Sequence, residues 1–560
     1  MDPIDSTDHT TPLLTHMVDG AVDYKVQPLL RSSSATLSSA AFIIGMEVAE
    51  RFAFYGIAAN LITYLTGPLR ISVVAAAEIV NVWSGTSMLL TLFGAFLADS
   101  FFGRYLTIVF ASISYLLGLG LLVLSTLLPT ANSSIYAAPK LHLILFFLSL
   151  CLIGIAQGGH RPCVQAFGAD QFDPQNPHEA KFKSSFFNWW YFGACFGIVV
   201  AIPTISYAQE NLSWTVGFVI PCVSMLIGFI LFLLGTKTYL FNTLEQSDNS
   251  PFWRIGRVFV AAIRNWRASA STITFQEDRT AKDLSNSQQF KFLNKACIIV
   301  PIDSNQNAMA CSISEVEEAK AILRILIIWV TVVVFTIAFA QDATFFTKQA
   351  ATLDRSIMWG FIIPAASLEA LVSFTCVIFV VLYDLLFVPI AKTVTGNPSG
   401  ITTLQRIGTG MVISSISMAV ASLVEKKRLK TAVEHGLIDR PEMTIPMRFW
   451  WLVPQYVLNG LADVFTVVGL QELCYDQVPK DLKSVGPAIF ISILGMGNIL
   501  SSLLISLIDT ATKANGHRSW FSNNLNKAHL DYFYLLLAAL SVLGFIAFLF
   551  VAKSHVYNNS

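Results

Sequence analysis

Three charged residues stand inside one apolar segment near the start of the chain, and their spacing is helical. Glu47, Glu50, Arg51 and Tyr55 follow one another at steps of three, one and four residues. At about 100° per residue, these side chains fall on one side of a helix and can face one cavity. A charge at mid-membrane depth costs on the order of 3 kcal/mol, so the three charges need partners or water. The pattern predicts a proton or substrate site; the alternative is an internal ion pair that holds this helix against a neighbour.

The composition is typical of a polytopic membrane protein. Of the 560 residues, 54% are hydrophobic and 13% are charged, and the mean hydropathy of +0.60 is too apolar for a soluble globular protein. The 36 basic and 36 acidic residues cancel, which argues against a nucleic-acid partner. The eight cysteines show no C-x-x-C spacing, and we find no nucleophile-base or phosphate-loop pattern. We therefore expect no enzyme activity, no metal and no cofactor apart from coupling protons.

Apolar segments of about 20 residues, the length that crosses a bilayer, occur twelve times. Six precede a long polar interval and six follow it, at roughly 39–65, 75–97, 106–127, 141–166, 186–207 and 214–234, then 322–345, 361–387, 401–424, 447–474, 488–507 and 532–551. This arrangement predicts an all-α membrane protein of two six-helix bundles. The predicted parts are a cytoplasmic tail (1–37), a first bundle (38–235), a cytoplasmic loop with an interfacial helix (236–318), a second bundle (319–553) and a short cytoplasmic tail (554–560).

The basic residues predict the orientation of the chain in the bilayer. Lysines and arginines are frequent in the loop 236–318, which places that loop in the cytoplasm, and an even number of spans places both termini there too. Within the loop, Pro251–Arg264 mixes apolar and basic positions and predicts a helix on the inner membrane surface. The segment Glu425–Lys430 disagrees with this topology, because it is basic and would form an outward-facing loop after the ninth span.

A short motif lies between the second and third predicted spans. There Asp99 can meet the end of a neighbouring helix, Gly103 permits a tight turn and Arg104 supplies a counter-charge, an arrangement that can break when bundles move. This pattern resembles the loop motif of the major facilitator superfamily, which implies the fold of that superfamily. Arg406 lies in a looser form of the motif in the second half, which fits the parallel halves of the superfamily.

Four further segments are similar, as a set, to one narrower family. They are Glu47–Phe52, Phe167–Asp173, Gly400–Gly408 and Gln471–Pro479. They resemble the plant nitrate/peptide transporter family (NPF), the plant branch of the proton-dependent oligopeptide transporters. The resemblance implies proton-coupled alternating access, with the first segment as the coupling motif and with Asp170 and Asp173 in gating or structural roles.

The charges themselves suggest how coupling would work. An ionised carboxylate is stabilised beside Arg51, and moving the arginine away favours protonation of the acid. Proton uptake and conformational change are then linked. The sequence leaves open whether Glu47 or Glu50 takes the proton.

The fourth predicted span carries His160 and Arg161, and the family resembled usually has a lysine in place of the arginine. Arginine keeps the positive charge but cannot lose it, so anion binding is retained and a lysine deprotonation step is not. Two roles stay open for Arg161: contact with an anionic substrate, or a fixed ion pair with Glu47 or Glu50. A histidine can titrate near physiological pH, but beside an arginine we expect this one to be packed and hydrogen-bonded.

Several positions bear on the substrate through the same resemblance. A dual-affinity nitrate transporter of the family has a histidine where this chain has Phe339, so nitrate binding through an imidazole is not available, and Gln341 of that segment is a further candidate contact. Peptide transporters often have an arginine where this chain has Ala58, which disfavours peptides. Glu472 matches a position that in peptide transporters holds the amine of the substrate. The alternative roles are a second proton site or a salt bridge between the bundles. Asn188, in an aromatic cluster, is a candidate hydrogen-bonding partner of the substrate.

Other polar residues at membrane depth give weaker predictions. Asp342 and Lys348 are a candidate ion pair, and Glu369 is a lone acid. A polar stripe on the tenth span, made by Gln455, Asn459 and Asp463, is expected to face the cavity. Thr107 resembles a phosphorylated threonine of the nitrate transporter, which would make a kinase a partner.

Together these features predict a proton-coupled symporter of a small solute, nitrate or an anionic organic metabolite or hormone, in the plasma membrane or the vacuolar membrane. One alternative is a symporter of di- and tripeptides. The other is a nutrient sensor or signalling protein with residual transport.

Overall fold

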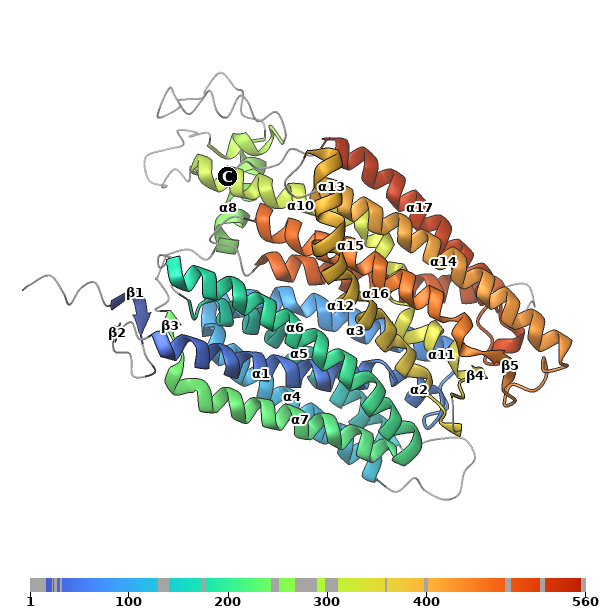
Figure 1. Ribbon diagram of the computed structural model, residues 1–560. Helices are drawn as coiled ribbons and strands as arrows, with labels where there is room; N and C mark the ends of the chain where they lie inside the picture. The colour runs from blue at the N-terminus through green and yellow to red at the C-terminus, as the bar shows by residue number, and fades with distance from the viewer. Residues whose placement is uncertain are drawn as a thin grey trace, which may run out of the picture. The chain divides into compact units, whose positions relative to one another are not determined.

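The computed structural model describes residues 17–22, 24, 28–30, 33–128, 140–172, 177–242, 251–266, 290–297, 311–357, 360–396, 401–478, 485–513 and 519–554, and most of them are helical (Figure 1). Eleven stretches within these ranges are long and apolar enough to cross a membrane. A further long helix, α1 (Ser33–Ala58), has 26 residues and carries Glu47, Glu50 and Arg51. With this charged helix, the structure contains the twelve predicted spans.

The chain divides into two compact units. The first comprises Met1–Asn60 and Phe101–Ser247, and the second comprises Leu61–Ser100 and Asp248–Ser560. The second predicted span therefore packs with the second unit, although the sequence places it in the first bundle. The boundaries of the two bundles stay a prediction.

The first unit encloses the charged helix between apolar ones. Its other helices are α4 (Arg104–Leu127), α5 (Lys140–Ala169), α6 (Pro177–Tyr207) and α7 (Trp214–Leu234). Helix α1 packs against α6 and α7, and α4 packs against α5 (Figure 1). The side chains of Glu47 and Glu50 consequently have no exposed surface.

A small antiparallel sheet joins the start of the chain to the segment after α7. Its strands are β1 (Met17–Val22), β2 (Pro28–Leu30) and β3 (Phe241–Asn242), in the order β2-β1-β3. The backbone pairs Ala21 with Asn242 and Val22 with Phe241. The predicted N-terminal tail and the beginning of the predicted central loop thus lie together, which agrees with placing both on one side of a membrane.

The second unit is built around one apolar core where its long helices meet. Its helices are α2 (Leu61–Thr66), α3 (Val73–Leu97), α8 (Pro251–Arg264), α10 (Ile313–Phe339), α11 (Thr347–Ala351), α12 (Ala370–Leu382), α13 (Val388–Thr395), α14 (Thr403–Glu434), α15 (Val453–Gln477), α16 (Val485–Lys513) and α17 (Leu530–Ser554), with a short parallel pair of strands, β4 (Leu353–Asp354) and β5 (Ile445–Arg448). Apolar side chains of α10, α14, α15 and α16 form one cluster that includes Ile328, Met411, Leu470 and Ile493. This core fixes α10 and α15, which carry most of the predicted substrate residues of this half.

The basic segment Glu425–Lys430 is not a loop, because α14 continues through it to Glu434. The guanidinium of Arg428 is buried, and its Nη2 lies 2.7 Å from an oxygen of Glu425. The Nζ of Lys427 lies 3.1 Å from the centre of the Trp451 ring. Part of the charge that conflicts with the predicted topology is therefore neutralised inside the unit.

The predicted interfacial segment is a helix, α8, with two different apolar faces. One face packs Val258 and Ala262 against Leu293 and Val316. On the other, Val260 and Ile263 are 67% and 69% exposed. Such a helix has an apolar stripe available for a further contact, and its placement on the membrane surface stays a prediction.

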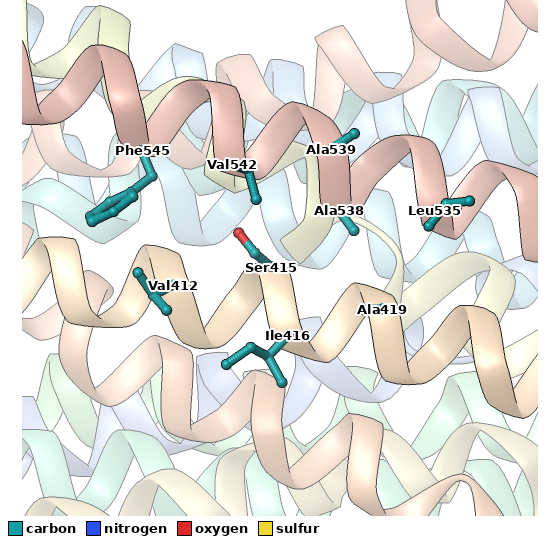
Figure 2. A pocket seen from close by; sticks show the side chains of 9 residues that line it. All are labelled: Val412, Ser415, Ile416, Ala419, Leu535, Ala538, Ala539, Val542 and Phe545. Atoms are coloured by element: carbon teal, nitrogen blue, oxygen red, sulfur yellow. The ribbon is translucent and has the colours of Figure 1, made fainter.

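A groove runs between α14 and α17 (Figure 2). Val412, Ile416, Leu535 and Phe545 line it with apolar surface. Ser415 also lines the groove, and its hydroxyl donates a hydrogen bond to the carbonyl of Met411 at 3.0 Å. Both walls of the groove are formed by helices that are long and apolar enough to cross a membrane.

Two glycines bring α3 and α16 into close contact within the second unit. A Cβ added at Gly85 would lie 2.7 Å from the carbonyl oxygen of Gly495, and the reverse distance is 2.8 Å. We expect Gly85→Ala to lower the free energy of unfolding by about 1–3 kcal/mol, because overpacking forces the helices apart. Thermal unfolding of the purified protein measures this. Gly120→Ala is the control: it has no atom within 4 Å, and the stability should stay the same or rise.

Candidate functional site

The charged residues of α1 form a compact, buried group. The Nε of Arg51 lies 2.7 Å from Oε1 of Glu47, one helical turn away, and 3.8 Å from Oε2 of Glu50. Arg51 is 12% exposed, whereas neither acid is exposed. One face of the helix therefore holds two carboxylates that share one guanidinium, as the spacing predicts.

Helix α5 brings a second polar group to this face of the first unit. Arg161 is 5% exposed, and its Cζ lies 4.9 Å from the ring centre of Phe54 and 5.8 Å from that of Tyr55. The predicted ion pair of Arg161 with Glu47 or Glu50 is absent among the described residues. Its Nε and Nη2 are buried and have no hydrogen-bond partner there. A cation held by aromatic rings with free N–H groups can bind an anion.

Several polar atoms of this buried group lack a hydrogen-bond partner among the described residues. Both oxygens of Glu50, Oε2 of Glu47, both ring nitrogens of His160 and the hydroxyl of Tyr115 lack a hydrogen-bond partner within the described ranges. The expectation that His160 is hydrogen-bonded is therefore wrong for the structure described. Two acids and two guanidiniums make the group formally neutral. Its burial still costs free energy unless small ligands, water or protons bind the polar atoms that lack a partner.

The motif before α4 contributes an ion pair near the end of the first unit. Arg104 pairs with Asp170, which follows α5. Gly103 has a φ of +75°, which only glycine adopts freely, so this residue starts α4 after a sharp turn. Asp99 lies in the π-helical turn Ala98–Phe102. Asp173 and the side chain of Asn188 lie outside the described residues, so their predicted roles stay predictions.

The candidate phosphorylation site, Thr107, is in the first turns of α4. It is 8% exposed, and its hydroxyl donates to the carbonyl of Gly103 at 2.9 Å. A kinase would reach the hydroxyl only if this end of the helix opened.

In the second unit, the candidate substrate contacts at the end of α10 pack against neighbouring helices. Gln341 is fully buried, and its Nε2 donates to the carbonyl of Ile337 at 2.9 Å and to the hydroxyl of Ser501 at 3.0 Å. The amide of Asn81 donates to the same hydroxyl at 3.1 Å. Phe339 is half-buried against the core cluster. Gln341 thus links α3, the end of α10 and α16. Its side-chain oxygen has no hydrogen-bond partner within the part of the chain that the structure describes.

Glu472 forms a salt bridge inside the second unit. Its Oε2 lies 3.4 Å from Nη1 of Arg406, and the Cζ of that arginine lies 4.2 Å from the ring centre of Tyr383. This salt bridge joins α14 to α15 within the second unit, whereas the predicted one joins the two bundles. At 44% exposure, Glu472 is also accessible to solvent.

Three acids of the second unit gather without a basic partner. Asp342 accepts a hydrogen bond from Asn459 at 2.7 Å, and both Glu369 and Asp463 lie close enough to repel it. The predicted pair with Lys348 is not formed, since the lysine donates to the hydroxyl of Thr66 at 3.0 Å. Within the part of the chain that the structure describes, no ion pair neutralises these acids. Sequence spacing suggested only separate acids and a polar stripe.

Within the described residues, eleven helices that are long and apolar enough to cross a membrane, together with the charged helix α1, define a polytopic membrane protein of the major facilitator type. A family model described as POT family (PTR2) matches residues 105–521. The chain is 54% identical to Protein NRT1/PTR FAMILY 5.10 of Arabidopsis thaliana over 98% of this chain and 97% of that protein. Protein NRT1/PTR FAMILY 5.13 of the same plant is 52% identical over 99% of both chains. The chain therefore belongs to the NRT1/PTR (NPF) family, the plant members of the POT transporters.

Solved structures agree with this fold. The crystal structure of an auto-inhibited POT family peptide transporter gives a TM-score of 0.70 at 23% identity, covering 93% of this chain and 98% of the other. The POT family transporter PepTSo gives 0.69 at 21% identity, covering 92% and 98%. The prediction of an all-α major facilitator fold is confirmed, and the chain is an integral multi-pass membrane protein of a transporter family.

Proposed function

We propose that the protein couples proton movement to the transport of a small anionic solute, nitrate or an anionic organic metabolite or hormone, by alternating access. The observation that carries this proposal is the guanidinium of Arg161, which lies against Phe54 and Tyr55 of α1 and has two nitrogens without a hydrogen-bond partner among the described residues. An anion bound by Arg161 would add negative charge to a neutral group, and protonation of Glu47 or Glu50 would compensate for it. Protonation of Glu47 would also release Arg51, whose new partners can favour the other conformation.

Uptake into heterologous cells tests the proposal. The panel contains nitrate, dipeptides and plant hormones, each at acidic and at neutral outside pH. We expect one anionic compound to enter faster at acidic pH, because the inward proton gradient drives it. The absence of any acid-stimulated flux across the panel would contradict proton coupling. A fluorescent fusion in plant cells then decides between the plasma membrane and the vacuolar membrane, the two locations we propose.

Arg161→Gln separates anion binding from proton coupling. We expect the apparent KM for the anion to rise about 30-fold, from the loss of roughly 2 kcal/mol of charge-assisted hydrogen bonding. Arg161→Lys keeps the charge but not the planar fork, and should give a smaller rise. Arg440→Gln, on an exposed arginine, serves as the control. An unchanged KM in Arg161→Gln would remove Arg161 from the substrate site.

Transport of di- or tripeptides is the second candidate, and the acids of the second unit favour it. Asp342, Glu369 and Asp463 would attract the amino group of a peptide, since they lack a basic partner among the described residues. Acid-stimulated uptake of a dipeptide, lost in Asp463→Asn, is the result that would support this candidate over the anion.

A further inference from the structure

His160 occupies an unusual position for a histidine without a known role. It lies on α5 and has no exposed surface. Both of its ring nitrogens lack a hydrogen-bond partner among the described residues. A buried polar atom without a partner costs about 1–3 kcal/mol, and an imidazole carries two such atoms. Packing alone would be better served by an apolar side chain, so the ring needs a ligand.

The two acids of α1 lie close to this ring, and each of them has an oxygen without a hydrogen-bond partner among the described residues. An oxygen of Glu47, an oxygen of Glu50 and a ring nitrogen of His160 lie within 4.8 Å of one another. This separation is close to what one water spans with two hydrogen bonds of about 2.8 Å. A single proton with one water, or a small rotation of the side chains, would therefore satisfy atoms of all three residues together.

The charges around the imidazole select the kind of ligand. Arg51 faces it from α1, and Arg161 is its neighbour on α5. The hydroxyls of Tyr55 on α1 and Tyr115 on α4 and the thiol of Cys195 on α6 are further titratable groups close to these charges. Two guanidiniums would repel a divalent cation. A single proton, shared with a carboxylate, adds the least charge and forms the missing hydrogen bond.

We propose that His160 is a third proton-binding residue of the Glu47–Glu50 site, and that the coupling proton is shared between its imidazole and these carboxylates. The inference rests on the proposed proton coupling. The proton leaves a ring nitrogen of the imidazolium for a carboxylate oxygen, directly or through one water. The net charge of the three-residue group is unchanged by this transfer, and no other reactant is needed. Each acid then titrates as part of a three-residue group.

Infrared difference spectroscopy of the purified protein in lipid, recorded during acidification, tests this without a substrate. The carboxylic-acid band that Glu47→Gln or Glu50→Gln removes reports on the site. In the wild-type protein the imidazole competes for the proton, so His160→Gln should move the midpoint of this band to higher pH by about one unit. His160→Asn, a second substitution that cannot be protonated, should shift the midpoint in the same direction. His142→Gln, on the same helix, should leave the midpoint unchanged.

Linkage also requires the reverse effect. In protein labelled with isotopic histidine, the imidazolium signal that disappears in His160→Gln belongs to His160. The pH midpoint of this signal should shift in Glu50→Gln. A Glu50-dependent band that is unchanged in both His160 variants would overturn this inference and leave the proposed coupling intact. If neither Glu47→Gln nor Glu50→Gln removes a band, the proposed coupling at these acids is itself wrong.

Discussion

Arg428→Met is expected to lower the free energy of unfolding by about 3–5 kcal/mol, because the substitution strands a buried carboxylate. Neither Arg428 nor Glu425 has exposed surface. The guanidinium holds both oxygens of Glu425, at 2.7 and 2.8 Å, and donates to the carbonyl of Leu525 at 2.7 Å and to Asn526 at 2.9 Å. Removing it therefore breaks contacts between α14 and the segment before α17. Thermal unfolding in detergent and the monodisperse fraction on gel filtration are the measurements.

Two further variants show whether the buried charge is the cause. Glu425→Gln combined with Arg428→Met removes both charges and should recover a large part of the lost stability. Lys430→Met breaks the pair of Lys430 with Glu434, which is 77% and 56% exposed, and should change the stability by less than about 1 kcal/mol. Equal unfolding temperatures for Arg428→Met and Lys430→Met would show that the buried pair contributes nothing.

If Glu50 takes the coupling proton, Glu50→Gln is expected to reduce proton-driven accumulation of the substrate by about 100-fold or more, the scale of losing one proton-transfer group. The amide has nearly the shape of the acid but cannot take up a proton. Exchange of labelled for unlabelled substrate, which needs no net proton movement, should continue. Proteoliposomes with an imposed pH gradient measure both activities, with the compound that the uptake panel identifies.

The pH dependence of uptake distinguishes the variant from the wild-type protein. Uptake by the wild-type protein should rise as the outside pH falls, because protonation of the site precedes the inward movement. Uptake by Glu50→Gln should be flat with pH if Glu50 carries the proton, and should keep its slope if Glu47 does. Glu434→Gln, on an exposed acid, should behave like the wild type. Accumulation that persists in both Glu50→Gln and Glu47→Gln would contradict coupling at α1.

The sequence by itself determined the features that depend on neighbouring residues. Apolar length predicts the spans, because crossing a bilayer needs about 20 residues in one helix. The spacing of Glu47, Glu50 and Arg51 predicts their common face and their shared ion pair, since residues one turn apart meet on any helix. The family motifs predict the major facilitator fold. The first two of these inferences require only the rise and turn of a helix, and the third rests on the resemblance of the motifs.

The tertiary structure decided which distant residues meet. Spacing suggests a pair between Asp342 and Lys348, but Asp342 begins the π-helical turn Asp342–Phe346, and its partner is Asn459 of α15. Arg161 lies against aromatic rings instead of an acid. The rotation of α5 about its axis places His160 beside the acids of α1, more than a hundred residues earlier. Such meetings depend on how whole helices pack, which no local pattern encodes.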